Sequence, residues 1–269
     1  MANAKDAPSD VLVLVYHAVS ERWDADTTVT PQQLSEQIRY LLARGYTSVT
    51  FEQALATPPP GKVLAITFDD AHRSVFEVAF PLLRELGAVA TVYAPTDYIG
   101  TGEPTRWEGF EADACGPHAS ELVCVDWEQL GVLADAGWEV GSHTCSHPHL
   151  TRLPDSTLRD ELVGSRELLE QRLGRPCRTL AYPYGDHDAR VVEAAGLAGY
   201  AFACTAPVGH QLSLPLRWGR VGSFRSDSQR RFRLLTSRSA RGFLATATGT
   251  LTADTVRTGK AWVREVRSG

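Results

Sequence analysis

Short apolar runs alternate with longer amphipathic stretches along most of this 269-residue chain. Runs of Val, Ile and Leu bounded by Gly or Pro predict buried strands, and apolar residues at helical spacing predict amphipathic helices. Strands that alternate with helices at this spacing predict a single α/β domain with a parallel sheet. The expected strands are residues 11–16, 45–49, 63–68, 88–93, 138–143, 178–181, 199–204 and 217–221. The expected helices are residues 31–42, 51–56, 71–86, 127–136, 155–173 and 187–195.

Two segments break this rhythm. Residues 95–125 contain Gly, Pro, acids and aromatic residues without a clear period, which is typical of a lid, a substrate wall or a poorly ordered loop. After residue 225 the pattern fades into Arg-rich and Ala/Thr-rich sequence. We therefore divide the chain into a tail (1–10), a main domain (11–225) and a C-terminal helical extension (226–269). Six arginines of the C-terminal part are interpreted as a solvated helix face, with an acidic partner or a phosphorylated substrate as the alternative: Arg225, Arg230, Arg231, Arg233, Arg238 and Arg241.

Composition and charge disfavour two classes of partner. A net charge of −5 at pH 7 leaves no basic footprint for nucleic acid. Residues 11–16 form an apolar run too short for a membrane span or a signal-peptide core, so we expect a cytoplasmic protein. Five cysteines without a C-x-x-C pair favour reduced thiols, with a Cys115–Cys124 bridge as the alternative. The sequence indicates no particular oligomeric state.

Two carboxylates directly follow an expected buried strand. Residues 63–68 lead into Asp69 and Asp70, and the carboxyl ends of parallel strands meet at one edge of a sheet. Adjacent side chains of an extended chain point to opposite sides, so the two acids are expected to have different tasks. His143 and His147 follow another expected strand, and their spacing brings both imidazoles to one side of a turn. Two His and one carboxylate with an open position are typical of a hydrolytic zinc site.

Each motif alone also has an ordinary structural explanation. Asp69 and Asp70 could cap a helix, and the two His could lie in a surface loop. Their joint occurrence at strand ends of an α/β chain favours the metal site. His17, just past the first expected strand, is either a core residue or a residue that lines the same site.

Three motifs in this order resemble those of the polysaccharide deacetylases, carbohydrate esterase family four. They are Thr67-Phe68-Asp69-Asp70, His143-Thr144-Cys145-Ser146-His147 and Ala181-Tyr182-Pro183-Tyr184-Gly185. The resemblance covers residues 11–223, and the Tyr-Pro-Tyr-Gly form is similar to the branch that acts on poly-N-acetylglucosamine-like substrates. It implies a distorted (β/α)7 barrel that removes an N-acetyl group from an amino sugar.

The resemblance also implies roles for single residues. Asp70, His143 and His147 would bind a divalent metal, and Asp69 would act as the general base. Zinc is the favoured ion, with cobalt, nickel or iron as alternatives. The third motif would form a wall of the substrate groove, and its backbone N–H at Tyr184 would stabilise the oxyanion. The expected substrate contacts are Tyr182, Pro183, Tyr184 and, from the insertion, Trp107.

The chain departs from the family pattern at three points. The residue after the two acids, usually Gly, is Ala71, and Ala181 replaces the Arg that in the family steadies the catalytic Asp. Arg217 or Arg220 could supply the missing cation. The late Leu-x-x-His motif that carries the general acid is absent, because no His follows His210. The proton donor to the leaving amine is therefore open, and its candidates are His17, His72, His210 and Asp69.

We expect a metal-dependent N-deacetylase whose substrate is an N-acetylglucosamine-type glycan, glycolipid or small glycoside. Two alternatives stay open: hydrolysis of another linear or cyclic amide on the same barrel, and a catalytically inactive sugar-binding module. The presence of Asp69 beside a complete ligand set speaks against the inactive module, since a metal triad alone does not need a second acid.

Overall fold

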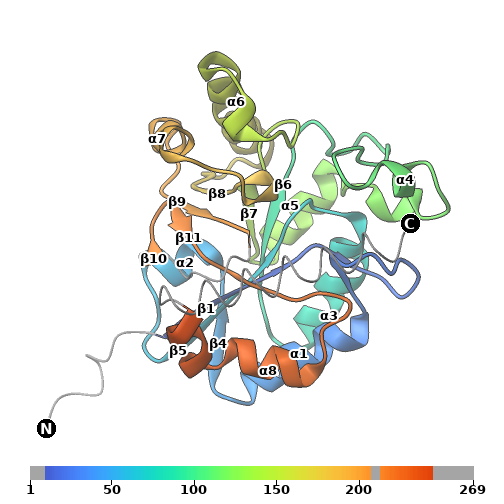
Figure 1. The fold of residues 1–269 in the computed structure, drawn as a ribbon, viewed down its shortest axis with the longest axis vertical. Coiled ribbons are helices and arrows are strands. Elements are labelled where there is room, and N and C mark those ends of the chain that lie inside the picture. Colours follow the sequence, from blue (N-terminus) through green and yellow to red (C-terminus); the bar gives the residue numbers. More distant parts are fainter. Residues whose placement is uncertain (1–9, 207–212, 245–269) are drawn as a thin grey trace, which may run out of the picture.

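The computed structural model describes residues 10–206 and 213–244, which form an α/β fold around one curled sheet (Figure 1). The predictions for the tail before residue 10, for His210 and for residues 245–269 lie outside the described residues. The strands are β1 (Asp10–Tyr16), β2 (Ala18–Val19), β3 (Thr28–Val29), β4 (Tyr46–Val49), β5 (Lys62–Phe68), β6 (Thr91–Ala94), β7 (Glu139–Ser142), β8 (Thr179–Ala181), β9 (Phe202–Cys204), β10 (Ser213–Leu214), β11 (Arg217–Trp218) and β12 (Val221–Gly222). The α-helices are α1 (Pro31–Leu42), α2 (Phe51–Ala56), α3 (Phe80–Glu85), α4 (Glu111–Ala114), α5 (Trp127–Asp135), α6 (Asp155–Leu173), α7 (Ala189–Leu197), α8 (Gln229–Thr236) and α9 (Arg238–Leu244). Short helical turns are η1 (Val75–Ala79), η2 (Ala119–Leu122), η3 (Leu150–Arg152) and η4 (Pro183–Gly185).

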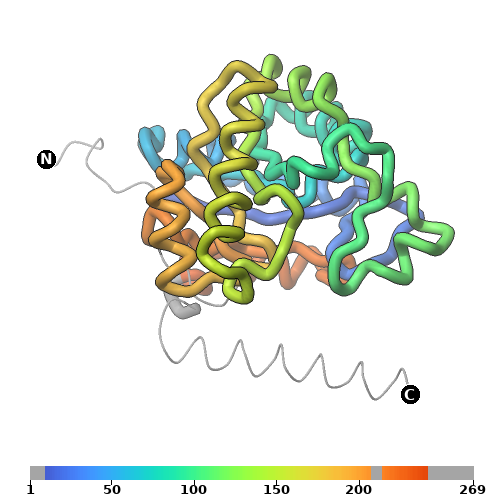
Figure 2. The backbone as a smooth tube through the Cα atoms, turned by 90° about the horizontal axis from the view of Figure 1, so that it is seen from above, coloured from blue at the N-terminus to red at the C-terminus, as the bar shows by residue number. Residues whose placement is uncertain are grey.

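The main sheet runs in the order β10-β11-β9-β8-β7-β6-β5-β1-β12, and β4 also pairs with β5. Its strands pair in parallel, except β10 with β11. The sheet curls into a half-barrel surrounded by helices, with α1 beside α8 and α6 beside α7 (Figures 1 and 2). This confirms the expected distorted barrel in a single domain. None of the described helices is long and apolar enough to cross a lipid bilayer.

One short segment links the two edges of the sheet. β11 extends the edge at β9, whereas β12 pairs with β1 at the other edge. Gly219 and Arg220 alone separate these two strands, so the chain passes here from one edge of the half-barrel to the other. The strand expected at 217–221 is therefore two strands with different neighbours.

Alternate residues of the central strands face two packed layers. Leu12, Leu14 and Tyr16 face the main core beneath the helices. Val13 faces the inside of the half-barrel, and other buried strand residues of this inner layer are Val63, Ala65, Tyr93, Ala181 and Cys204. Both faces of these strands are buried, which explains why they are near-continuous apolar runs in the sequence.

The helix after β5 begins later than expected. Asp70 and Ala71 have left-handed backbone conformations, with φ of 68° and 48°. A right-handed helix requires negative φ, so the predicted start at Ala71 is wrong, and helical backbone begins at Arg73, just before η1. At the start of α5, Asp126 forms a capping box with Gln129.

The C-terminal arginines fall into two groups. The exposed ones, as expected of a solvated face, are Arg230, Arg231, Arg233 and Arg238. Arg241 is buried instead, and its Nη2 lies 2.6 Å from Asp10 Oδ1. Arg225 donates a hydrogen bond of 2.5 Å to Ser20 O. The prediction of a solvated face is therefore wrong for these two residues, because each ties the C-terminal part to the N-terminal part of the domain.

The 95–125 insertion has defined contacts with the domain. It contains α4 and η2, and Cys124 forms a β-bridge with His72. Cys115 is exposed and Cys124 is buried, and all five cysteines are free thiols. The alternative of a bridge between these two is therefore wrong.

Candidate metal centre

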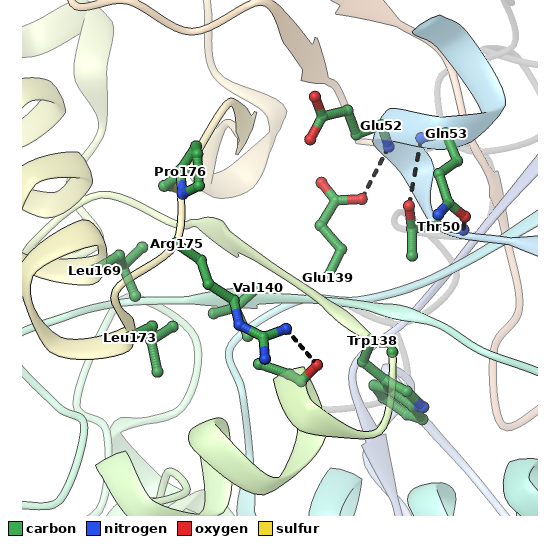
Figure 3. A pocket seen from close by; sticks show the side chains of 13 residues that line it. Thr50, Glu52, Gln53, Trp138, Glu139, Val140, Leu169, Leu173, Arg175 and Pro176 are labelled. Carbon is green, nitrogen blue, oxygen red and sulfur yellow. Dashed lines mark hydrogen bonds between the residues drawn. The ribbon is translucent and has the colours of Figure 1, made fainter. Parts of the chain in front are cut away.

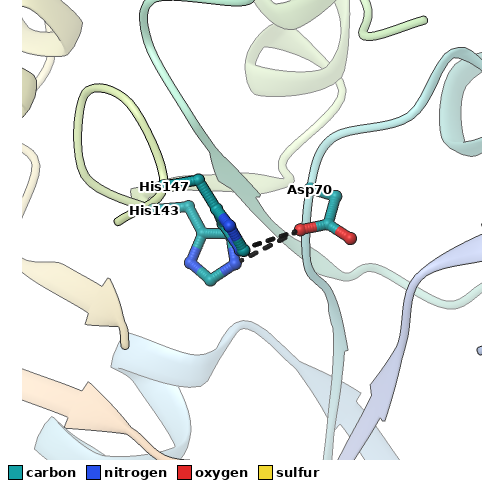
Figure 4. Close-up of side chains that lie close together, drawn as sticks. All are labelled: Asp70, His143 and His147. Atoms are coloured by element: carbon teal, nitrogen blue, oxygen red, sulfur yellow. Dashed lines mark ion pairs between the residues drawn. The ribbon is translucent and has the colours of Figure 1, made fainter. Parts of the chain in front are cut away.

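Two loops bring three potential metal ligands together. Asp70 follows β5, and His143 and His147 lie on the loop after β7. β5 and β7 are the two neighbours of β6 in the parallel sheet, so their carboxyl ends open onto the same end of the half-barrel. One ligand atom from each of the three side chains lies within 4.8 Å of the others (Figure 4).

Both imidazoles approach the same oxygen of the Asp70 carboxylate. Asp70 Oδ1 lies 3.4 Å from His143 Nε2 and 3.5 Å from His147 Nε2. All three residues are buried. Thr144 and His147 have left-handed backbone conformations, with φ of 68° and 61°, as Asp70 does. Such conformations cost energy in residues other than Gly and cluster at functional sites.

The donor atoms fit a divalent metal ion. Asp70 Oδ1 is buried and has no hydrogen-bond partner within the described ranges. His143 Nδ1 lies 2.8 Å from Ala181 O, which favours a proton on Nδ1 and leaves the Nε2 lone pair free. Burial and the neighbouring charge of His143 lower the pKa of His147 to about 3, so this imidazole is neutral at pH 7. A carboxylate and two imidazoles are a typical ligand set for zinc.

Asp69 has a different partner. Arg220 Nη1 and Nη2 each donate a hydrogen bond of 2.7 Å to one Asp69 oxygen, so the pair is bidentate. The guanidinium also donates to Thr205 O at 2.8 Å and to Thr67 Oγ1 at 3.1 Å. Burial alone would raise the pKa of Asp69, but the charge and hydrogen bonds of Arg220 outweigh it and hold this pKa below its usual value.

The closure of the sheet explains why Arg220 makes this contact. It lies between β11 and β12, on the segment that passes between the two sheet edges. Arg217 precedes this segment on β11 and is half-exposed. Of the two candidate cations, the structure therefore brings Arg220 to Asp69. Ala181, at the position of the expected family Arg, is buried and offers its carbonyl to His143.

Two more histidines lie close to the carboxylates. His72 Nε2 is 3.3 Å from Asp70 Oδ2, and the His72 side chain is 1% exposed. The left-handed turn at Asp70 and Ala71 accounts for this approach, which a helix starting at Ala71 would not produce. His17 is half-buried, and burial lowers its pKa although the charges of Asp70 and Asp69 oppose the shift.

Residues 56–203 match the model of the polysaccharide deacetylase family. The chain belongs to this family. It is 24% identical over 241 residues to the poly-beta-1,6-N-acetyl-D-glucosamine N-deacetylase of Staphylococcus aureus, a match that covers 76% of the chain and 78% of that protein. The solved structure of the Streptococcus pyogenes deacetylase PplD in complex with acetate matches with a TM-score of 0.71 and 22% identity, over 84% of this chain and 98% of that one. BC0361, a polysaccharide deacetylase from Bacillus cereus, matches with a TM-score of 0.69 and 26% identity, over 83% of this chain and 67% of that one.

In this member of the polysaccharide deacetylase family, most of the expected groove residues are buried. Trp107 is 6% exposed, and its ring stacks on His147 at a centroid distance of 4.1 Å. Tyr182 is 1% exposed and donates its hydroxyl to Leu216 O at 3.0 Å. Pro183 is buried as well. These three side chains pack beside the candidate metal loop and the strand ends, and their contact with a substrate stays a prediction.

Tyr184 is the expected groove residue that does reach the surface. Its side chain is 37% exposed, and φ of 57° gives it a left-handed backbone. Its ring lies parallel to that of His149, with centroids 4.0 Å apart. His149 in turn places Nε2 3.1 Å from Glu108 Oε2 and Nδ1 3.6 Å from Asp186 Oδ2. The sequence reasoning missed His149, and its signal was a third His directly after the metal-ligand spacing.

A cavity of about 320 Å³ lies near the start of β7, whereas the candidate metal ligands follow the end of the same strand (Figure 3). Glu139 lines the cavity and accepts hydrogen bonds from Glu52 N at 2.8 Å and Thr91 Oγ1 at 3.0 Å. Burial raises the pKa of Glu139. These contacts join α2, β6 and β7, so we assign Glu139 a structural role.

Proposed function

We propose that this chain is a metal-dependent N-deacetylase that removes acetyl groups from N-acetylglucosamine-type glycans. The observation that carries the proposal is a separate carboxylate, Asp69, directly beside the Asp70–His143–His147 ligand set. A purely structural metal site needs ligands alone, whereas hydrolysis also needs a base next to them. The activity for which the Staphylococcus aureus relative is named supports the substrate class.

In this proposal, Asp70, His143 and His147 hold the metal ion, with zinc as the favoured species. When bound, such an ion lowers the pKa of a coordinated water and polarises the amide carbonyl. Asp69 takes a proton from the attacking water, because Arg220 keeps its carboxylate ionised. Both Asp69 oxygens accept one hydrogen bond from Arg220 and keep further lone pairs for this transfer.

We assign the proton donor to His17 and the oxyanion contact to the backbone N–H of Tyr184. His17 directly follows β1, the strand that pairs with β5, so it lies at the same end of the half-barrel as the metal ligands. It is half-buried, and although burial lowers its pKa, the charges of Asp70 and Asp69 favour the protonated imidazole that a donor needs. The His72 side chain, in contrast, is 1% exposed and lies against Asp70. His72 is therefore better suited to contact the ligand carboxylate than to protonate a sugar amine.

Removal of the metal with a chelator is expected to abolish acetate release, and restored zinc or cobalt should recover it. The reason is that none of the four site side chains can polarise the amide carbonyl as a metal ion does. These side chains are Asp69, Asp70, His143 and His147. We would measure released acetate from β-1,6-linked N-acetylglucosamine oligomers, with the β-1,4-linked oligomers, the monosaccharide and a nucleotide sugar as matched comparisons. Release from none of these, together with hydrolysis of a linear or cyclic amide, would favour the alternative amide hydrolase.

His17→Gln is expected to lower kcat by about 100-fold, because it removes the proton donor to the leaving amine. Metal affinity should stay unchanged, since His17 is outside the three-residue ligand set. Steady-state kinetics and metal titration test both statements, with His118→Gln in the insertion as the control that retains full activity. An unchanged kcat in His17→Gln would instead make Asp69, by returning its proton, the donor.

A further inference from the structure

The loop between the two histidine ligands rests on α6. Glu161 Oε2 accepts hydrogen bonds from the backbone N–H groups of Cys145 at 2.8 Å and Ser146 at 2.9 Å. Its other oxygen, Oε1, accepts the Ser146 hydroxyl at 2.5 Å. One carboxylate thus contacts two consecutive residues in the short interval between His143 and His147.

The same face of α6 makes two more contacts with this region. Ser165, one helical turn after Glu161, has its Oγ 2.8 Å from Ser142 Oγ, directly before the first histidine ligand. Gly164 lies against Cys145, and a Cβ at Gly164 would come within 3.3 Å of Cys145 Sγ. α6 therefore packs closely against the loop, and Glu161 is the charged residue of α6 that contacts it.

On its other side the loop accepts backbone hydrogen bonds from the segment after β6. Thr96 N donates to Thr144 O at 3.1 Å, and Asp97 N donates to Cys145 O at 3.0 Å. These bonds fix the carbonyl side of the loop, while Glu161 fixes its N–H side. Within the described part of the chain, no Lys or Arg forms an ion pair with Glu161, so the loop N–H groups and the Ser146 hydroxyl are its partners.

The loop needs such support because its backbone is strained. Thr144 and His147 both have positive φ, and a left-handed conformation is unfavourable for residues other than Gly. A strained segment persists only when its surroundings hold it. Hydrogen bonds to a carboxylate are among the stronger ones available for this purpose.

We propose that Glu161 is a positioning residue of the metal centre: it holds the loop so that His143 and His147 present their nitrogens to one ion. The inference rests on the metal-binding part of the proposed function. It concerns a residue of α6 whose side-chain hydrogen bonds within the described residues go to Cys145 and Ser146 of the loop and not to the imidazoles of His143 and His147.

Metal affinity is the measurement that tests the role of Glu161. We would titrate metal-free protein with zinc against a chromophoric chelator, and record the visible spectrum of the cobalt form. Glu161→Ala is expected to weaken zinc binding by about 10–100-fold and to change the cobalt spectrum. Glu161→Gln should keep most of the affinity, because its amide oxygen still accepts the two backbone N–H groups. Glu167→Ala, on the exposed side of the same helix, is the matched control and should bind as the parent chain does.

The outcomes separate this inference from the deacetylase proposal. If the parent chain binds zinc but releases no acetate, the deacetylase proposal fails and Glu161 is still judged by affinity. Parent-like affinity and an unchanged cobalt spectrum in Glu161→Ala would overturn the positioning role. Should Glu161→Ala fail to fold, Ser146→Ala removes one of the three bonds, and an affinity equal to that of the parent chain would then count against the proposal.

Discussion

Asp69→Asn is expected to lower kcat for acetate release by about 10²–10⁴-fold while zinc still binds. Asn is nearly isosteric with Asp but cannot accept a proton at neutral pH, so it removes the base. It also leaves the buried Arg220 without a charged partner, so the stability of the variant is measured alongside its activity. Asp69 is outside the ligand set, and its partner is Arg220. The measurement pairs steady-state kinetics on the preferred glycan oligomer with a zinc titration of the same preparation.

The neighbouring residue is the matched control. Asp70→Asn makes the same chemical change one position along, but it removes a negative charge from the oxygen that approaches both His143 and His147. We expect this variant to lose zinc affinity as well as activity. Equal activity in Asp69→Asn and the parent chain would exclude Asp69 as the base, and equal loss of zinc in both variants would mean that both acids bind the metal.

The candidate metal centre could be predicted from the sequence because the carboxyl ends of parallel strands meet at one end of the sheet. Asp70 and the two histidines each come after an apolar run, and the loops that leave parallel strands at their carboxyl ends gather at one end of the sheet. Spacing and residue type therefore predicted a set that the structure brings within 4.8 Å. The loop conformation was not accessible, because the left-handed backbone at Ala71 and Thr144 goes against the usual preference of these residues.

The residues that pair across the fold were harder to predict. Arg220 and Asp69 are far apart in sequence, and their contact exists because β11 and β12 join opposite edges of the sheet. From the sequence alone, Arg217 was an equally good candidate for the cation beside Asp69. The stacking of Trp107 on His147 could not be predicted, since the sequence does not show whether an aromatic residue of the insertion packs on another side chain or faces solvent.

Arg220→Met is expected to destabilise the metal-free protein by about 3–5 kcal/mol, because it leaves Asp69 buried without its partner. Met fills part of the space of the aliphatic part of Arg220, so the decrease in the free energy of unfolding reflects mainly the lost charge. Urea unfolding at neutral pH measures it. The double variant Arg220→Met/Asp69→Asn removes both charges and should recover part of the stability, whereas additive losses in a double-mutant cycle would contradict a direct pairing.

The pH dependence of this variant follows from the same pair. In the parent chain the folded-state pKa of Asp69 is held below its unfolded value, so its contribution to stability is present above the unfolded pKa and is lost as the pH falls through the folded one. Without Arg220, burial is expected to raise this pKa above the unfolded value, so acidification should bind a proton to folded Asp69 and stabilise the fold. The stability difference between the two chains should therefore shrink as the pH is lowered from neutral toward the unfolded pKa of about 4. A raised pKa would also leave Asp69 partly protonated near neutral pH, so Arg220→Met should lose activity at neutral pH and regain some of it at alkaline pH, a profile that Asp69→Asn cannot show.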